Sequence, residues 1–334
     1  MKVALVGYGY WGKNIARNFS QNPKFQLHTI CDLDENNLSA ASLLYPNCKF
    51  ISDYKAISDD VDIVALIVPV HLHYPLADYF LDQGKHILLT KPFTQNLEET
   101  EKLLQKSREK NLTVFADHTF IFNPAVRKLK ELLPKIGDPY LVMSSRLNLG
   151  LYQPDVNVIY DLMPHDLSII NYLFNTEILS AETTSFSAAG LPQEDFAQSS
   201  LVFENGVRAF VTVSWLSPYK IRDFIVVGSE GMLSYDDNQV TEKVKFYDKG
   251  VDISELIPGS QKVNYTAKLN YKAGDSFSPA INGVEALKFE FDEFLLAIND
   301  RKVRASYDAV TLRTMRSLEK VINSQEQLKI KKAG

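Results

Sequence analysis

Three polar residues stand in patterns that suit acid–base chemistry on a substrate. Lys91 follows a short apolar stretch and precedes Pro92, and the next basic residue comes eleven positions later, at Lys102. Asp161 and His165 are four residues apart in "DLMPHD" (161–166). On a helix this spacing places both side chains on one side. A lysine could stabilise charge on a substrate oxygen, and a histidine could accept its proton.

Pro164 locates the expected helix around His165. Proline is tolerated in the first turn of a helix but not in its interior, so a helix over 163–174 is predicted. Asp161 then lies near the N-cap and His165 one turn in, where the helix dipole favours the neutral imidazole of a general base. The alternative is that Asp161 only caps the helix, His165 is a structural histidine and Lys91 is a surface lysine.

A glycine-rich stretch, "VGYGYWGKN" (6–14), follows an apolar run at 2–6 and precedes a predicted helix at 11–20. Its glycines, Gly7, Gly9 and Gly12, have the spacing of a dinucleotide-binding turn. Asp32 ends the next predicted strand, where an acid accepts hydrogen bonds from ribose hydroxyls. Residues 33–48 contain no lysine or arginine, which favours NAD over NADP. A plain turn carboxylate is the alternative for Asp32.

Strands and helices alternate through the first 120 residues. Strands are predicted at 25–32, 61–68, 86–90 and 113–117, with helices at 75–84 and 97–110. Such alternation predicts a doubly wound parallel sheet with ligands at the carboxyl ends of its strands. Cofactor contacts are therefore expected from Gly7, Gly9, Tyr10, Trp11, Gly12, Asp32, Pro69, His73, Lys91 and Pro92.

The second half has a different pattern. Strands are predicted at 140–150, 179–188, 198–204, 207–215, 221–228 and 231–235, with helices at 124–134, 163–174, 284–298 and 306–323. Residues 250–282 are predicted to be irregular. The fold class is an α/β Rossmann domain (1–120) followed by an α+β substrate-binding and oligomerisation domain (121–334) with an open, mainly antiparallel sheet. One face of this sheet needs a cover, either the first domain or a second subunit, and a homodimer or homotetramer is expected.

Composition excludes several classes of protein. The 334 residues carry a net charge of −5, which argues against a nucleic-acid partner. The longest apolar run, 64–70, is too short for a membrane span, and no signal peptide precedes the first strand. Two cysteines, Cys31 and Cys48, without a disulfide framework suit a cytoplasmic protein. His71 and His73 have no third ligand at a suitable spacing, so no metal site is predicted.

These motifs together resemble the Gfo/Idh/MocA family of NAD(P)-dependent sugar and polyol oxidoreductases. The resemblance runs nearly end to end, through "GYGYWGKN", Asp32, "PVHLH" (69–73), "TKP" (90–92), "FNPAVRKLKEL" (122–132), "DLMPHD" and "VVGSEGMLSYD" (226–236). It implies that Lys91, Asp161 and His165 form the catalytic group. Thr90 replaces the usual glutamate before the lysine, and Met163 stands where glycine is usual.

The residues of "GYGYWGKN" and "DLMPHD" most resemble those of family members that act on nucleotide-linked sugars in surface-polysaccharide pathways. The alternative substrates are a free sugar or polyol, or an imine, aldehyde or diene. The alternative to an enzyme is a non-catalytic dinucleotide sensor. Arg146 could pair with a substrate carboxylate or pyrophosphate, or form a salt bridge of the fold. His118 could approach the nicotinamide or be a buried histidine. Substrate contacts are expected from His118, Arg146, Asn148, Tyr152, Asp155 and Asn157.

Overall fold

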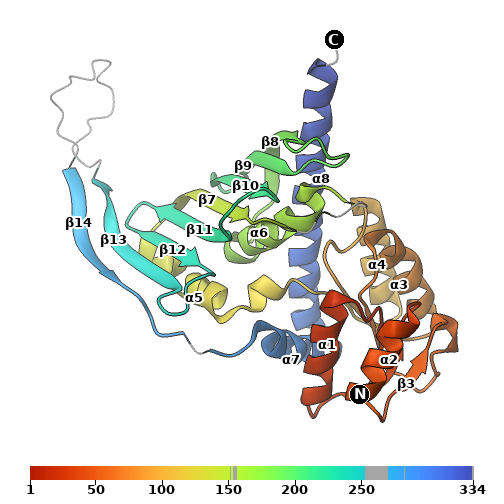
Figure 1. Ribbon diagram of the computed structural model, residues 1–334. Helices are drawn as coiled ribbons and strands as arrows, with labels where there is room; N and C mark the ends of the chain where they lie inside the picture. The colour runs from red at the N-terminus through yellow and green to blue at the C-terminus, as the bar shows by residue number, and fades with distance from the viewer. Residues whose placement is uncertain (151, 153–155, 253–269, 282, 333–334) are drawn as a thin grey trace. The chain divides into compact units, whose positions relative to one another are not determined.

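The computed structural model describes all residues except 151, 153–155, 253–269, 282 and 333–334 (Figure 1). The chain divides into two compact units, Met1–Asn123 with Val284–Glu319, and Pro124–Gly283 with Lys320–Gly334. This division differs from the predicted contiguous domains 1–120 and 121–334. The difference arises because α7 (Ala286–Asn299) packs on the first unit. Its Phe291 stacks on Phe19 with ring centroids 4.1 Å apart.

The first unit is built on a six-stranded parallel sheet in the order β3-β2-β1-β4-β5-β6. Its strands are β1 (Lys2–Val6), β2 (Gln26–Cys31), β3 (Lys49–Ile51), β4 (Ile63–Leu66), β5 (His86–Leu89) and β6 (Val114–Ala116), and its helices include α1 (Tyr10–Gln21), α2 (Glu35–Leu44), α3 (His73–Asp82) and α4 (Leu97–Glu109). The predicted doubly wound Rossmann sheet is confirmed. The strand order reverses between β1 and β4, which is where ligands bind in such sheets.

The second unit is built on an eight-stranded sheet in the order β14-β13-β12-β11-β7-β10-β9-β8. The strands are β7 (Pro139–Leu147), β8 (Ile178–Phe186), β9 (Phe196–Phe203), β10 (Arg208–Ser214), β11 (Ile221–Gly228), β12 (Met232–Asp236), β13 (Val244–Asp252) and β14 (Asn270–Phe277). Only the β7–β10 pair among them is parallel, so the mainly antiparallel sheet is confirmed.

Two parts of the sequence prediction for this sheet were wrong. β13 was not predicted, and β14 lies inside the stretch 250–282 that was predicted to be irregular. β14 is polar and contains a glycine, so its side chains carry no strand signal, and its pairing with β13 comes from backbone hydrogen bonds. Residues 253–269 of that stretch lie outside the described part of the chain.

Helices α5 (Pro124–Leu132) and α6 (Val158–Phe174) lie along one face of this sheet (Figure 1). The opposite face carries half-exposed apolar side chains. Met143 of β7 is 41% exposed and stands beside Phe210 of β10, which is 43% exposed. Phe186 of β8 is 49% exposed. In the second unit this sheet face is therefore open and apolar.

The C-terminal helix α8 (Arg301–Lys332) is the longest element that the structure describes. Among the helices of the described residues, each is either too short or too polar to serve as a membrane span.

Candidate functional site

The glycine loop between β1 and α1 has a conformation that requires glycine at two positions, Gly7 and Gly12. Gly7 has φ of +96°, and a Cβ there would lie 2.1 Å from the carbonyl oxygen of Ile67. A Cβ on Gly12 would lie 2.2 Å from the Gly7 carbonyl oxygen. A Cβ on Gly9 would meet nothing within 4 Å, so packing does not demand this glycine. Gly9 is the N-cap of α1, where exposed amides attract anions.

Asp32, directly after β2, is held by two backbone amides. Its Oδ2 accepts a hydrogen bond from the Tyr8 amide at 2.6 Å, and its Oδ1 accepts one from the Asp34 amide at 2.8 Å. Leu33 and Tyr10 are 88% and 86% exposed, an unusual state for large apolar side chains near such a turn. An open Gly9 and a fixed carboxylate fit the pyrophosphate and ribose of a nicotinamide dinucleotide.

Lys91 and Pro92 follow β5 at the carboxyl edge of the sheet, and the peptide bond between them is cis. The side chain of Lys91 is partly exposed, whereas Pro92 is buried. Pro69, after β4, is exposed at the same edge. Lys91 and Pro69 therefore stand where the sequence placed cofactor contacts.

His73 has a different position from the predicted cofactor contact, because its side chain is only 1% exposed. Its Nδ1 lies 3.0 Å from the Pro92 carbonyl oxygen, and its Nε2 lies 2.9 Å from the Val68 carbonyl oxygen. Burial lowers the pKa of His73, although these carbonyls oppose the shift. The imidazole joins the loops after β4 and β5, so His73 positions the chain around Lys91.

Asp117 and His118 follow β6. His118 is 4% exposed, and burial lowers its pKa to about 4, so the imidazole is neutral. This burial supports the structural alternative over a direct substrate contact. Trp11, predicted as a cofactor contact, donates its indole N–H to Asp117 Oδ2 at 2.7 Å. Trp11 therefore ties the glycine loop to the end of β6.

In the second unit, α6 carries Asp161 and His165, but its start was wrongly predicted. The helix begins at Val158, and Asn157 caps it by accepting a hydrogen bond from the Tyr160 amide at 3.1 Å. Pro164 lies inside the helix and not in its first turn. Asp161 is in the first turn and His165 lies one turn beyond it. Because the dipole acts mainly within the first turn, its predicted effect on His165 does not apply.

Asn157 was expected to contact substrate. Its Oδ1 caps α6, and its Nδ2 donates to Glu194 Oε2 at 3.1 Å. The observed contacts of Asn157 thus position the helix that carries Asp161 and His165. Asp155 lies outside the described residues.

Trp215, directly after β10, is a site residue that sequence reasoning missed. It is 3% exposed, and its indole N–H donates to Asp161 Oδ2 at 2.9 Å. The ring of Tyr152 meets it edge to face, with centroids 5.9 Å apart. Asn148 lies at the same end of β7, where its amide N donates to the Ser214 carbonyl. Trp215 thus fixes one carboxylate oxygen of Asp161 beside Tyr152.

Arg146 lies on the covered face of the sheet and not at an exposed surface. Its Nε donates to Asp166 Oδ2 at 2.8 Å and its Nη2 to Asp166 Oδ1 at 3.1 Å. Both side chains are buried, and Ser144 donates a further hydrogen bond to Asp166. Burial alone would lower the pKa of Arg146, but the Asp166 charge holds it above its usual value. These contacts support the salt-bridge alternative for Arg146.

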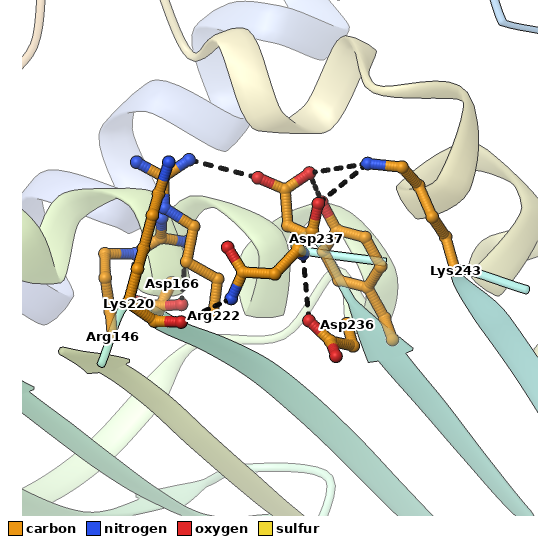
Figure 2. A network of polar contacts seen from close by, with 9 residues as sticks. Arg146, Asp166, Lys220, Arg222, Asp236, Asp237 and Lys243 are labelled. Carbon is orange, nitrogen blue, oxygen red and sulfur yellow. Dashed lines mark hydrogen bonds and ion pairs between the residues drawn. The ribbon is translucent and has the colours of Figure 1, made fainter. Parts of the chain in front are cut away.

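Figure 2 shows that this ion pair is part of a larger polar network. Arg222 of β11 stands directly opposite Arg146 of β7, so two like charges share one face. Such a pair is destabilising without counterions. Asp237 accepts a hydrogen bond from Arg222 Nη1 at 3.0 Å and another from Tyr235. Asp166 and Asp237 thus neutralise the neighbouring arginines, and Asp166, next to His165, fixes α6 on the sheet.

We expect Arg146→Met to lower the free energy of unfolding by about 3–5 kcal/mol, because Asp166 would be left as an uncompensated buried charge. The double variant Arg146→Met/Asp166→Leu should recover most of this loss. Chemical denaturation of each purified variant measures both values. Lys102→Met, which breaks an exposed pair with Glu98, is the control and should change stability little. Equal stability of Arg146→Met and wild type would contradict the structural role.

Across the described residues, no group of three or more His, Cys, Asp or Glu side chains is arranged to hold a metal ion.

Comparison with known proteins gives consistent matches for both units. Residues 1–118 match the family described as "Oxidoreductase family, NAD-binding Rossmann fold", and residues 126–234 match "GFO/IDH/MocA C-terminal domain". UDP-N-acetylglucosamine 3-dehydrogenase of Acidithiobacillus ferrooxidans is 26% identical over 263 residues, covering 78% of this chain and 80% of its own.

Solved structures share the whole architecture. The same Acidithiobacillus enzyme superposes with a TM-score of 0.78 at 22% identity, covering 98% of both chains. A protein of gentamicin A biosynthesis in complex with NAD gives 0.80 at 18% identity, covering 97% of this chain and 93% of its own.

A 3-ketoreductase from Actinomadura kijaniata in complex with TDP-benzene and NADP gives a TM-score of 0.78 at 16% identity, covering 97% of this chain and 98% of its own. At these identities the structural likeness shows the fold alone. The two family matches cover most of the chain, including the glycine loop and the helix that carries Asp161 and His165. This chain belongs to the Gfo/Idh/MocA family and is an NAD(P)-dependent dehydrogenase or reductase.

Proposed function

We propose that this enzyme uses NAD to oxidise, reversibly, a secondary alcohol of a sugar, and that the sugar is linked to a nucleotide. The observation that carries the proposal is the held carboxylate of Asp161, bonded by Trp215 and set one turn before His165 on α6. A fixed acid and a histidine on one helix suit proton removal from a hydroxyl. Lys91 at the carboxyl edge of the Rossmann sheet supplies the positive charge.

In this mechanism His165 accepts the hydroxyl proton of the substrate. Lys91 donates a hydrogen bond to the same oxygen and stabilises the negative charge that develops on it. Asp161 orients the substrate, and Trp215 keeps the Asp161 carboxylate in place. A nicotinamide dinucleotide supplies the hydride chemistry when bound.

The choice of NAD over NADP rests on Asp32. Its carboxylate is held in place by the Tyr8 and Asp34 amides, and it would repel a 2′-phosphate. Residues 33–48, which follow it, contain no basic side chain to attract one. Solved structures of this fold contain NAD in one case and NADP in another, so the fold alone does not select the cofactor.

The nucleotide-sugar substrate is supported by the relatives and by the loop after β7. One relative is a UDP-N-acetylglucosamine 3-dehydrogenase, and another was solved with TDP-benzene. Asn148 and the half-exposed Tyr152 lie at the same end of β7 as Trp215. We assign these two residues to substrate binding. The open face around Met143 and Phe210 supports a homodimer or homotetramer, in which a second copy covers it.

The function is tested by incubating the pure protein with NAD or NADP and a panel of nucleotide sugars, free sugars and polyols. We expect nicotinamide reduction with a nucleotide sugar, and a kcat/KM at least about tenfold higher with NAD than with NADP. Parallel reactions with an added keto-acid acceptor detect a reduced cofactor that stays bound. Turnover of free polyols alone would contradict the substrate proposal, and binding of NAD without any turnover would indicate a sensor.

A further inference from the structure

Glu290 of α7 is a fully buried acid in the first unit. Its side chain is 0% exposed, and in the described part of the chain neither of its carboxyl oxygens has an N–H or O–H donor within hydrogen-bond reach. An ionised carboxylate in such a position has lost its water and gained nothing in return, at a cost of several kcal/mol. Glu290 must therefore be neutral in the folded protein.

A neutral carboxylic acid carries an O–H donor that itself needs an acceptor. The carboxyl group of Asp117 lies close enough to provide one. Two ionised carboxylates cannot hydrogen-bond each other, whereas a protonated one donates to an ionised one in a short, strong bond. Burial raises the pKa of Glu290 well above its usual range, and the Asp117 charge raises it further.

Asp117 is the acceptor of this pair. It already accepts the indole N–H of Trp11 at 2.7 Å on Oδ2 and the hydroxyl of Thr119 on Oδ1. In both contacts the Asp117 carboxyl group acts as an acceptor. The O–H of a neutral Glu290 would add a third donor to Asp117, which is only 2% exposed.

The network joins three segments that are far apart in the sequence. Trp11 belongs to the glycine loop and the first turn of α1, Asp117 follows β6, and Glu290 comes from α7. Gly9, whose open backbone suits the pyrophosphate, is two residues before Trp11. A shift of the Asp117 carboxylate would therefore be passed directly to the cofactor-binding turn.

We propose that Glu290 is kept as a neutral acid whose proton, donated to Asp117, holds Trp11 and with it the glycine loop in the conformation that binds the dinucleotide. Glu290 and Asp117 are positioning residues, and they act through Trp11. This inference needs only dinucleotide binding, so it is independent of the substrate proposed above.

The binding test compares Glu290→Met, Glu290→Gln and Trp11→Phe in the full-length protein. The dissociation constant for NADH is measured from the nicotinamide fluorescence, and the unfolding temperature is measured in parallel. Glu290→Met removes the donor, and Trp11→Phe removes the indole N–H. Each should weaken NADH binding about tenfold, since a hydrogen bond to a charged group is lost. Glu290→Gln keeps an N–H donor for Asp117 and should weaken binding clearly less.

The double variant Trp11→Phe/Glu290→Met separates positioning from general damage. If both residues act through Asp117, the NADH dissociation constant of the double variant should equal that of the single variant that binds NADH less tightly. Independent, multiplicative losses would overturn the proposal. A Glu290→Met protein that is less stable but binds NADH as tightly as wild type would also overturn it.

The protonation state is tested without the cofactor. Infrared spectra of the wild type near neutral pH should contain a carbonyl band of a buried protonated acid that Glu290→Gln lacks. Asp308, whose pKa burial raises to about 6, is present in both proteins and cancels in the difference. Absence of that band would show that Glu290 is ionised and would overturn the inference.

Discussion

Replacing His165 with alanine is expected to lower kcat by about 10²–10⁴-fold, because the proposed base for the substrate proton is removed. The dissociation constant for NADH should not change, since the glycine loop and Asp32 are intact. Steady-state turnover with the nucleotide sugar that the panel identifies, combined with NADH binding, measures both quantities.

Ser168→Ala is the matched control for this change. Ser168 lies on α6, and its hydroxyl donates to the backbone carbonyl of His165. We expect this variant to keep turnover close to that of the wild type. If His165→Ala also kept full turnover, His165 would not be the base.

Replacing Lys91 with alanine is expected to lower kcat by about 10²–10³-fold, because the proposed donor to the developing negative charge is lost. Lys91→Arg keeps the positive charge but replaces the compact ammonium with a planar guanidinium, so this variant should recover only part of the activity. NADH binding again serves as the second measurement. A Lys91→Ala variant that changed only the dissociation constant for NADH would show that Lys91 binds cofactor without assisting the chemistry.

The cofactor-binding turn could be predicted closely from the sequence. Its residues are set by short-range geometry. Gly7 has a positive φ, and Gly12 lies against the Gly7 carbonyl. Asp32 stands at the end of the neighbouring strand, where it accepts a hydrogen bond from the Tyr8 amide. The pattern of apolar residues likewise predicted the parallel sheet, because continuous apolar runs such as that of β4 indicate strands buried on both faces.

The helix that carries the proposed base could not be predicted as well. Pro164 is a strong local signal for a helix start, yet α6 continues through it from the Asn157 cap. Packing of Val158, Ile159 and Met163, all fully buried, outweighs the local preference.

The roles of buried polar residues were the least predictable part of the site. His73 was predicted to contact the cofactor, and His118 was left between a nicotinamide contact and a buried histidine; the fold buries both. The sequence is compatible with two roles for Arg146, a substrate contact or a salt bridge, and only the tertiary structure brings Asp166 beside it. Trp215 resembles an ordinary core residue in the sequence, and only the tertiary structure brings its indole to Asp161.

The central claim is that Lys91 and His165 act together on one substrate oxygen. A double-mutant cycle of kcat for wild type, Lys91→Ala, His165→Ala and the double variant tests it most directly. Groups that serve the same transition state are strongly non-additive, so the double variant should lose hardly more than the worse single variant. Losses that simply multiply would contradict a shared site.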